Sequence, residues 1–335
     1  MKKAFKKMGF FVLCLTMIFS LAACSSSETK NGAIEVEDQA GRKVTFEKPA
    51  EKIVSCYYIS TYACLSLDLG DELAAIEMKA NQRPIYQMAQ PDLLNLPQVG
   101  SLKEINIEAI AAVEPDLVIL PMKLKDKLSA LEELGINVLI VNPESHELLV
   151  EMLKLLGEVC DREKQADQLT EYYEDELDDI EELGQTDTRV YMAANSSYLE
   201  TAPKNLYQND LIETAGGINV AGDIEGDYWT PVSYETIIKM NPEMIVIPAG
   251  ATFTEDDIYN DQQLQNIDAV THKKVYAMPQ GIEEWDSPIP SGILGTMWLA
   301  SLLHEDEYSF EEFKDDVYDF YKEFYGFEID RSLIG

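Results

Sequence analysis

Two glutamates, Glu108 and Glu235, are the residues whose placement most strongly suggests a chemical role. Each is the third residue of a 16-residue segment, 106–121 or 233–248, and the two segments align without a gap at an offset of 127 residues. A carboxylate can pair with an arginine in a fixed geometry, so one anchor in each half of a repeat would suit a symmetric partner. Simple capping in a duplicated fold is the alternative, because a carboxylate is favoured in the first turn of a helix.

Cys24 is a second candidate for chemistry. It follows a leader with four lysines within residues 2–7 and an uncharged apolar run over residues 8–23. This run is short for a membrane span, which needs roughly 20 apolar residues. Leu-Ala-Ala-Cys at 21–24 resembles the lipobox of bacterial lipoproteins, whose cysteine is lipidated and becomes the new N-terminus. We therefore expect a signal peptide over 1–23 and a lipid anchor on Cys24, with a flexible tether over 24–33. An ordinary signal peptide with a chance cysteine is the alternative.

Aromatic and cationic residues follow, or lie between, the predicted strands. Ligands of α/β folds bind at the carboxyl ends of strands, so these positions predict a cleft. Aromatic faces suit a large, flat or partly apolar ligand, although core packing of each aromatic is the alternative. The cations are candidate partners for an anionic chelate in a chain this acidic. The predicted cleft residues are Tyr57, Tyr58, Lys79, Arg83, Lys123, Tyr198, Tyr228, Trp229 and Trp285.

The histidines argue against a site for a bare metal ion. His146, His272 and His304 fall in unrelated positions, whereas sites for zinc or manganese need converging imidazoles and carboxylates. The sequence also lacks Gly-x-Ser-x-Gly, His-Glu-x-x-His and a Walker loop. A hydrolase or metalloenzyme outside the cytoplasm is thus disfavoured, and neither catalytic residues nor an intrinsic cofactor are expected.

The charge of the chain excludes another class of function. Sixty-one acidic residues face 26 basic ones, for a formal charge of −35, and without residues 1–23 the balance becomes 22 against 61, or −39. A chain this acidic is repelled by phosphate backbones, so nucleic-acid binding is not expected. Outside the leader and Cys24, an odd number of cysteines remains, which cannot form a complete disulfide set. Buried packing is expected for Cys56, Cys64 and Cys160, whose state the sequence leaves open.

The elements that must position these residues are predicted by the same repeat. Each copy consists of a short helix, a proline that stops it and a buried strand, and the chain before the first copy begins with a hairpin over 34–46. Between the copies, apolar residues recur every three or four positions, which predicts a helix about 34 Å long. We expect an α/β fold in which two similar lobes, 34–157 and 187–335, are joined by one long helix within 158–186.

The lipobox, the segment 38–46, and Asn-Ile-Glu at 106–108 ahead of 114–119 together resemble the substrate-binding lipoproteins of ABC importers. The likeness extends over about residues 35–327 and is to the helical-backbone, or class III, periplasmic binding proteins, which deliver ferric siderophores, haem and cobalamin. The resemblance implies two Rossmann-like lobes joined by a single long helix, with a ligand cleft between them, and a monomer. It also implies that Glu108 and Glu235 dock onto arginines of a permease dimer, which works with an ATPase.

The expected function is therefore the capture of a metal chelate outside the cytoplasm, by a protein anchored to the cell membrane, for delivery to a permease. A ferric siderophore comes first and a corrinoid second, with haem and a molybdate-type oxyanion behind. Only five arginines occur in the whole chain. A highly anionic catecholate complex would require several guanidinium groups, so this composition argues mildly against it.

Overall fold

A β-hairpin opens the part of the chain that the computed structural model describes, which is residues 32–279 and 281–335. Strands β1 (Ile34–Glu37) and β2 (Lys43–Phe46) pair antiparallel, which confirms the predicted hairpin. The carboxylate of Asp38 accepts hydrogen bonds from the backbone N–H groups of Ala40, Arg42 and Ile140 and from the Arg42 guanidinium. This buried side chain therefore fixes the hairpin against the sheet that follows.

The N-terminal lobe is built on a four-stranded parallel sheet with the order β4-β3-β7-β8. Every residue of β3, β7 and β8 is buried, as expected for parallel strands covered on both faces. Its strands are β3 (Ile53–Ser55), β4 (Leu73–Ala75), β7 (Leu117–Pro121) and β8 (Val138–Val141), with a small hairpin of β5 (Gly100–Ser101) and β6 (Glu104–Ile105). Its helices are α1 (Tyr58–Ser66), α2 (Pro84–Ala89), α3 (Ile107–Ala112), α4 (Leu128–Glu132) and α5 (His146–Val159), with 3-10 turns at Ala80–Gln82, Pro91–Asn95 and Met122–Lys127.

The C-terminal lobe contains a mixed sheet with the order β12-β10-β9-β13-β14, and β11 also pairs with β9. Strands β11, β9, β13 and β14 are parallel, whereas β10 and β12 run antiparallel at the edge. Its strands are β9 (Arg189–Ala194), β10 (Ser197–Thr201), β11 (Ile218–Asn219), β12 (Thr230–Pro231), β13 (Met244–Ile247) and β14 (Val275–Ala277). Its helices are α7 (Tyr207–Thr214), α8 (Tyr234–Met240), α9 (Glu255–Asn260), α10 (Asp268–Thr271), α11 (Gly292–Leu303) and α12 (Phe310–Phe324), with a 3-10 turn at Arg331–Leu333.

The sequence repeat is also a structural repeat. Helix α3 precedes β7, and helix α8 precedes β13. In its sheet, β7 lies between the parallel strands β3 and β8, just as β13 lies between the parallel strands β9 and β14. The N-cap side chain of Asn106 accepts from the Ala109 N–H at 3.0 Å, and that of Ser233 accepts from the Thr236 N–H at 3.2 Å. Both helices therefore begin at matching places, which is why Glu108 and Glu235 both fall in a first turn.

The ends of the repeat helices match as well. Glu114 and Asn241, again 127 residues apart, adopt left-handed φ angles of 46° and 43°. The residue before a proline disfavours the helical backbone conformation. Each helix of the repeat therefore ends here, and the chain continues into the buried strand. The prediction of two similar α/β lobes is thus confirmed by the geometry of the repeat.

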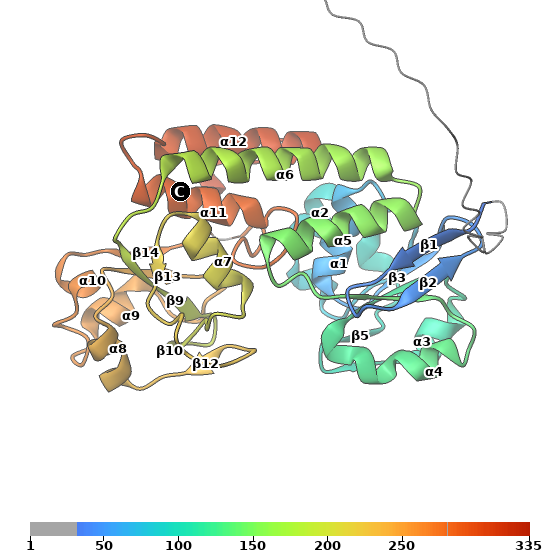
Figure 1. The fold of residues 1–335 in the computed structure, drawn as a ribbon, viewed down its shortest axis with the longest axis horizontal. Helices are drawn as coiled ribbons and strands as arrows, with labels where there is room; N and C mark the ends of the chain where they lie inside the picture. Colours follow the sequence, from blue (N-terminus) through green and yellow to red (C-terminus); the bar gives the residue numbers. More distant parts are fainter. Residues whose placement is uncertain (1–31, 280) are drawn as a thin grey trace, which may run out of the picture. The chain divides into compact units, whose positions relative to one another are not determined.

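Helix α6 (Glu163–Leu183) is the long helix between the lobes. Its 21 residues end at Leu183 and are followed by Gly184, whose φ of 87° suits glycine. In Figure 1, α6 runs beside α12 above both sheets. Rings of the two helices touch, since the centroid of Tyr172 lies 5.6 Å from that of Phe320. The aromatic residues of α12 therefore pack in the core.

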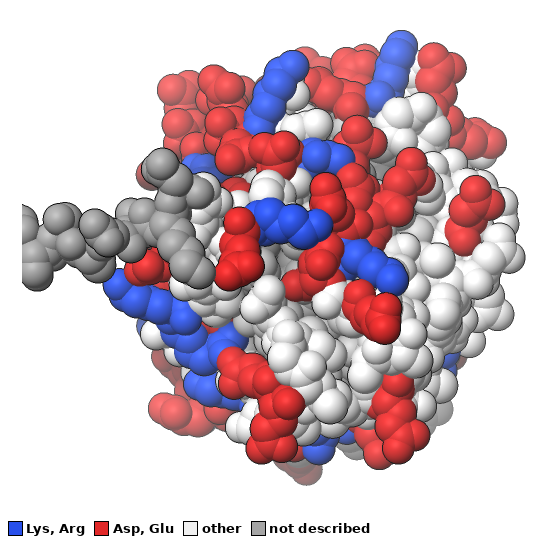
Figure 2. All heavy atoms as spheres, turned by 90° about the vertical axis from the view of Figure 1, so that its right-hand side faces the viewer, with Lys and Arg blue, Asp and Glu red and all other residues white. Residues whose placement is uncertain are grey.

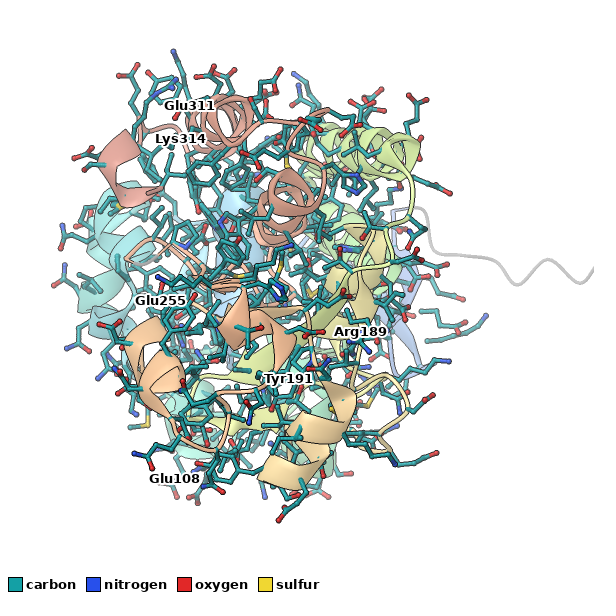
Figure 3. The ribbon with its side chains drawn as sticks, turned by 90° about the vertical axis from the view of Figure 1, so that its left-hand side faces the viewer. Glu108, Arg189, Tyr191, Glu255, Glu311 and Lys314 are labelled. Atoms are coloured by element: carbon teal, nitrogen blue, oxygen red, sulfur yellow. The ribbon has the colours of Figure 1, made fainter. Side chains whose placement is uncertain are left out.

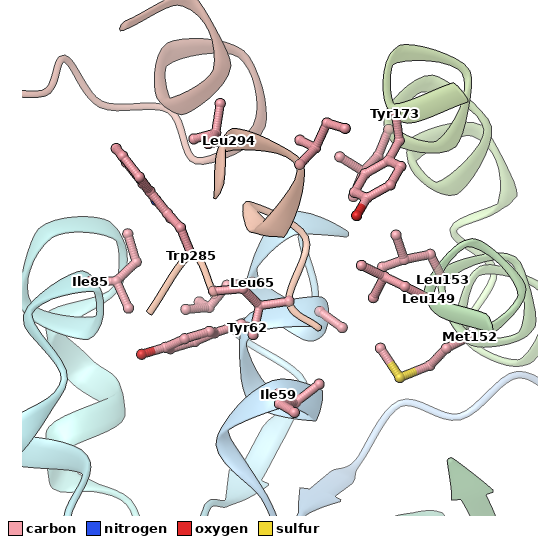
Figure 4. Packing of buried hydrophobic residues seen from close by; sticks show 14 of the residues in the cluster. Ile59, Tyr62, Leu65, Ile85, Leu149, Met152, Leu153, Tyr173, Trp285 and Leu294 are labelled. Atoms are coloured by element: carbon pink, nitrogen blue, oxygen red, sulfur yellow. The ribbon is translucent and has the colours of Figure 1, made fainter. Parts of the chain in front are cut away.

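A single hydrophobic cluster extends through both lobes. It includes Tyr62 of α1, Leu149 of α5, Tyr173 of α6, and Trp285 and Leu294 from the segment after β14 (Figure 4). The lobes are thus connected by a continuous buried core as well as by α6. Because close-packed cores resist shear, we expect limited movement of one lobe against the other.

Acidic side chains are spread over much of the surface on the side of the N-terminal lobe, with Lys and Arg scattered among them (Figure 2). The face shown contains no large basic area. Among the described acidic residues, Asp38, Glu77, Glu283 and Asp286 are the buried ones, so most are solvated surface groups, which favour solubility.

Candidate ligand-binding cleft

A cavity of about 930 Å³ is lined by residues of both lobes. In the N-terminal lobe, the lining follows the carboxyl ends of β3, β7 and β8, where ligands of open parallel sheets bind. In the C-terminal lobe, it follows β9 and the loops before β12 and α11. The lining residues used below are Tyr57, Tyr58, Arg83, Lys123, Glu144, Gln208, Asn205, Asp227, Tyr228, Trp229, Glu284, Asp286 and Ser287.

The N-terminal wall is aromatic. Tyr57 and Tyr58 lie at the start of α1, and their rings meet edge to face with centroids 4.5 Å apart. The Tyr58 hydroxyl lies 3.0 Å from the Ser287 hydroxyl of the other lobe. Burial, and then the Glu284 carboxylate, raises the pKa of Tyr58 to about 12. The phenol is therefore neutral at physiological pH and can donate a hydrogen bond.

Arg83 is placed over this wall but is already paired. Its guanidinium carbon lies 3.9 Å above the centre of the Tyr58 ring, which is a cation–π contact. Its Nη1 lies 2.5 Å from Oε1 of Glu284 in the other lobe. The Tyr62 hydroxyl donates to the second oxygen of Glu284 at 3.2 Å. The guanidinium of Arg83 is thus already paired with a carboxylate of the opposite lobe.

The C-terminal wall also presents aromatic rings. Tyr228 is exposed, and the Lys123 ammonium of the N-terminal lobe lies 4.5 Å from its ring centre. Trp229 beside it is half-buried and lines the cavity. The Asp227 carboxylate accepts from the Asn205 amide at 3.3 Å. Both walls can therefore offer ring faces to a ligand with an organic body.

Asp286 contributes a buried carboxylate to the lining. It is 3% exposed, and its Oδ1 has no hydrogen-bond partner among the described residues. Its backbone carbonyl accepts from the Gln208 amide at 2.7 Å. Burial, followed by repulsion from the nearby Glu284, raises the pKa of the Asp286 carboxyl to about 7. Such a group is sensitive to any cation or donor that enters the cleft.

Six of the predicted cleft residues lie together around this cavity, and three do not. Tyr57, Tyr58, Arg83, Lys123, Tyr228 and Trp229 line it.

The remaining three lie elsewhere. Lys79 is exposed at the start of a 3-10 turn, where its φ is 68°. The Tyr198 hydroxyl donates to Asp261 at 2.8 Å. Trp285 is 1% exposed, and its Nε1 donates to the Tyr321 hydroxyl at 2.8 Å. It faces the core because an apolar environment and a polar partner for its N–H are both available there.

Several cleft residues were missed by the sequence prediction. Glu144 follows the buried strand β8. Glu284 and Asp227 lie in loops with no periodic pattern, so only the fold brings them to the cavity. The signal that could have found Glu144 is its place directly after a buried strand.

The comparisons with known proteins agree with this geometry. Residues 53–281, more than half of the chain, match the family model described as periplasmic binding protein. The chain belongs to this family. The molybdate-binding protein MolA of Haemophilus influenzae is 26% identical over 91% of this chain and 95% of its own. An ABC transporter substrate-binding lipoprotein of Bacillus subtilis, YvrC, is 25% identical over 90% of this chain and 99% of its own.

Solved structures of periplasmic binding proteins show the same fold. A periplasmic solute-binding protein from Veillonella parvula superposes with a TM-score of 0.76 and 27% identity, covering 90% of this chain and 96% of its own. The structure of MolA bound to molybdate gives a TM-score of 0.78 at 24% identity, covering 88% and 99%. This chain is therefore a solute-binding protein of an ABC transporter and not an enzyme.

As in other periplasmic binding proteins, the place of action is outside the cytoplasm. Within residues 32–279 and 281–335, no helix is both long and apolar enough to cross a membrane. The predicted signal peptide and Cys24 lie outside the described residues, so the lipid anchor stays a prediction.

The two repeat glutamates are exposed and accessible to a partner. Neither Glu108 nor Glu235 forms an ion pair with another side chain of the described segments. Figure 3 shows Glu108 at the opposite end from Glu311 and Lys314 of α12, and α8 lies toward the same end as Glu108. Glu108 and helix α8, whose first turn contains Glu235, thus lie at the end away from α6 and α12. Their docking role stays a prediction.

Metal-ligating residues do not converge in the part of the chain that is described. No group of three or more His, Cys, Asp or Glu there could hold a metal ion. Cys56, Cys64 and Cys160 are free and buried, and burial raises the pKa of the Cys56 and Cys160 thiols to about 12. These thiols are protonated at neutral pH and are therefore poor metal ligands.

Proposed function

We propose that this periplasmic binding protein captures a metal chelate with an organic body, most specifically a ferric siderophore, and delivers it to an ABC-importer permease. The observation that carries the proposal is the cavity of about 930 Å³ with aromatic rings on both walls, two tyrosines on the N-terminal side and a tyrosine and a tryptophan on the C-terminal side. Sites of this volume accommodate ligands of drug size. A tetrahedral oxyanion, counted as four oxygens of water size, fills only about 120 Å³.

The chemistry of the walls supports the same reading. Neutral phenols at Tyr57 and Tyr58 can donate to the oxygen atoms of a chelate, while the ring faces of Tyr228 and Trp229 can cover its carbon skeleton. No described cluster would bind an unchelated metal ion, so the metal would arrive already coordinated.

A molybdate-type oxyanion is the second candidate. It is favoured by the likeness to MolA, a molybdate-binding protein, over 91% of this chain. Corrinoids are represented among the relatives by a vitamin B12-binding protein of Salmonella choleraesuis, which is 27% identical over 50% of this chain and 64% of its own. Haem would fit the volume as well, so both compounds belong in the test.

The test is native mass spectrometry of the chain from residue 25 onward, whose Ala33–Gly335 part is one compact unit. The probes are a ferric trihydroxamate, a ferric tris-catecholate, cobalamin, haem and molybdate. We expect one ferric complex to be retained in a one-to-one ratio and molybdate not to be retained. Retention of molybdate with no chelate bound would overturn the proposal in favour of the oxyanion.

Delivery requires attachment and docking. A lipid on Cys24 would hold the monomer at the membrane, and Glu108 and Glu235 would each meet an arginine of the permease dimer, whose ATPase drives import. The exposure of both carboxylates and their matched places in the repeat support this arrangement.

A further inference from the structure

The charges that line the cavity are unbalanced. After the Arg83–Glu284 ion pair is set aside, one cation remains among the described lining residues, Lys123, whose ammonium lies over the Tyr228 ring. The sequence had suggested that the cleft cations would receive an anionic chelate, but the structure leaves them engaged. The charged residues of the lining are the cations Arg83 and Lys123 and the carboxylates Glu144, Asp227, Glu284 and Asp286.

Asp286 differs from a structural aspartate that is equally buried. Asp38 is also 3% exposed, yet its two carboxylate oxygens accept hydrogen bonds from three backbone N–H groups and from a guanidinium. Oδ1 of Asp286 has no such partner in the described parts of the chain. A buried polar atom without a partner is costly, so native proteins retain such atoms mainly where another molecule satisfies them.

The two observations point to the same kind of ligand. A polyanion entering this cleft would meet three carboxylates, Glu144, Asp227 and Asp286, against one cation outside the Arg83–Glu284 pair, Lys123. The charge of Arg83 is already balanced by Glu284, so the cleft is unfavourable to further negative charge. A ligand with an ammonium or N–H group would instead give Asp286 the donor that it lacks. Charge-assisted hydrogen bonds of this type are short and strong.

We infer that the cleft selects chelates of zero or positive net charge and that Asp286 accepts a hydrogen bond from an ammonium or N–H group of the ligand. This inference rests on the proposed function, because it specifies the class of chelate. It distinguishes a hydroxamate-type or amine-bearing complex from a catecholate complex or a bare oxyanion.

The experiment compares three ferric complexes by tryptophan fluorescence titration. The first is the complex of desferrioxamine B, a linear trihydroxamate with a terminal primary ammonium, which is cationic. The second is the same complex with that amine acetylated, which is neutral, and the third is a trianionic tris-catecholate. We expect the cationic complex to bind about tenfold more tightly than the neutral one, as one additional charge-assisted hydrogen bond allows, and the trianion to bind least.

Two variants locate the effect. The Asp286→Asn variant should bind the cationic and the neutral complex with equal affinity. The Asp227→Asn variant, changed at an exposed carboxylate of the same cavity, should keep most of the affinity difference between the two complexes. Thermal unfolding checks that both variants are folded, and the comparison of the three complexes on the unmodified protein requires no variant.

The outcomes separate this inference from the proposed function. Equal affinity of the unmodified protein for the cationic and neutral complexes, or tightest binding of the trianion, would overturn the inference and leave the binding of chelates intact. Binding of none of the three complexes would overturn the inference and the ferric-siderophore assignment of the proposed function.

Discussion

Arg83 of the N-terminal lobe and Glu284 of the C-terminal lobe form an ion pair across the cleft, with Nη1 and Oε1 2.5 Å apart. The pair is about one-quarter exposed on each side, and Glu284 also accepts from the Tyr62 hydroxyl. One carboxylate therefore both neutralises the cleft arginine and connects the two lobes.

Removal of this carboxylate should change the ligand charge that the cleft tolerates. In Glu284→Gln, Arg83 loses its partner and the cleft gains one positive unit, so the affinity for the ferric tris-catecholate should rise about tenfold at low salt and less at high salt. Fluorescence titration measures it. Glu225→Gln, an exposed carboxylate outside the cavity lining, is the control. An unchanged affinity for the trianion would show that Arg83 does not face the ligand.

Trp229 should report ligand binding. Of the three tryptophans, Trp229 alone lines the cavity, whereas Trp285 and Trp298 are 1% and 3% exposed. In Trp229→Phe we expect the ligand-dependent fluorescence change to be lost and the affinity to fall about threefold to tenfold, because an indole face is removed. Trp298→Phe should retain the change. A full signal in Trp229→Phe would contradict this position of the ligand.

The docking role of Glu108 and Glu235 predicts a separation of transport from binding. The double variant Glu108→Ala plus Glu235→Ala should bind ligand as the unmodified protein does, but uptake into cells should fall at least about tenfold, as for the loss of interface hot spots.

The matched control for docking is Glu163→Ala plus Glu311→Ala, which removes exposed carboxylates from the first turns of two other helices. Each substitution removes a favourable interaction with the helix dipole, worth about 0.3–1 kcal/mol, so the control reproduces any loss of stability. Unchanged uptake in the Glu108 and Glu235 double variant would remove the docking assignment.

His146 should stabilise the junction between the lobes in its neutral form. Its Nδ1 lies 2.7 Å from the Tyr173 hydroxyl, and its Nε2 lies 3.2 Å from the Thr296 hydroxyl of α11. Burial lowers the pKa of His146 from 6.5 to about 4. The stability from this group is therefore fully present above about pH 6.5 and is lost as the pH falls toward 4.

Urea unfolding of His146→Ala tests this role. At about pH 7.5 the free energy of unfolding should fall by about 2–4 kcal/mol, since the substitution leaves a cavity and removes one hydrogen-bond partner from each of the Tyr173 and Thr296 hydroxyls. The loss should be smaller at about pH 5, where the unmodified protein is already penalised. The exposed His272→Ala should stay within about 0.5 kcal/mol at both values. A loss that is the same at both pH values would rule out a neutral, buried imidazole.

Glu283 should have the opposite pH dependence. It is buried, and its carboxylate accepts from the hydroxyls of Tyr321 at 2.7 Å and Tyr325 at 3.3 Å. Burial raises the pKa of Glu283 from 4.5 to about 7. The folded protein thus favours the protonated form, and the stability from this group is present below about pH 4.5 and lost as the pH rises to 7.

Glu283→Gln removes that loss because the amide is neutral at every pH and its oxygen can still accept from a tyrosine. The unfolding free energy of the variant minus that of the unmodified protein should increase by about 2 kcal/mol as the pH rises from about 5 to about 8. Urea unfolding at both values measures the difference. Glu312→Gln, at an exposed carboxylate, should show no such gain. A variant that loses stability at the higher pH would mean that Glu283 is ionised in the fold.

The local pattern of the sequence determined much of this protein. The 127-residue offset predicted two equivalent helix–strand units, and the periodic apolar positions predicted α6, because helix stops and buried strands depend on neighbouring residues. The family resemblance rested on the same segments. Strand ends also located Tyr57, Tyr58 and Lys123, since the carboxyl end of a parallel strand is where the chain turns toward a cleft.

Only the tertiary structure decided which way the remaining side chains face and how their charges pair. Trp285 and Asp286 are neighbours in the chain, yet the first donates to Tyr321 in the core and the second lines the cavity. The pairing of Arg83 with Glu284 joins residues 201 positions apart. Such a contact depends on the packing of two lobes against each other, and no local pattern contains that information. The charge of the cleft is therefore a property of the fold, whereas the total charge is a property of the sequence.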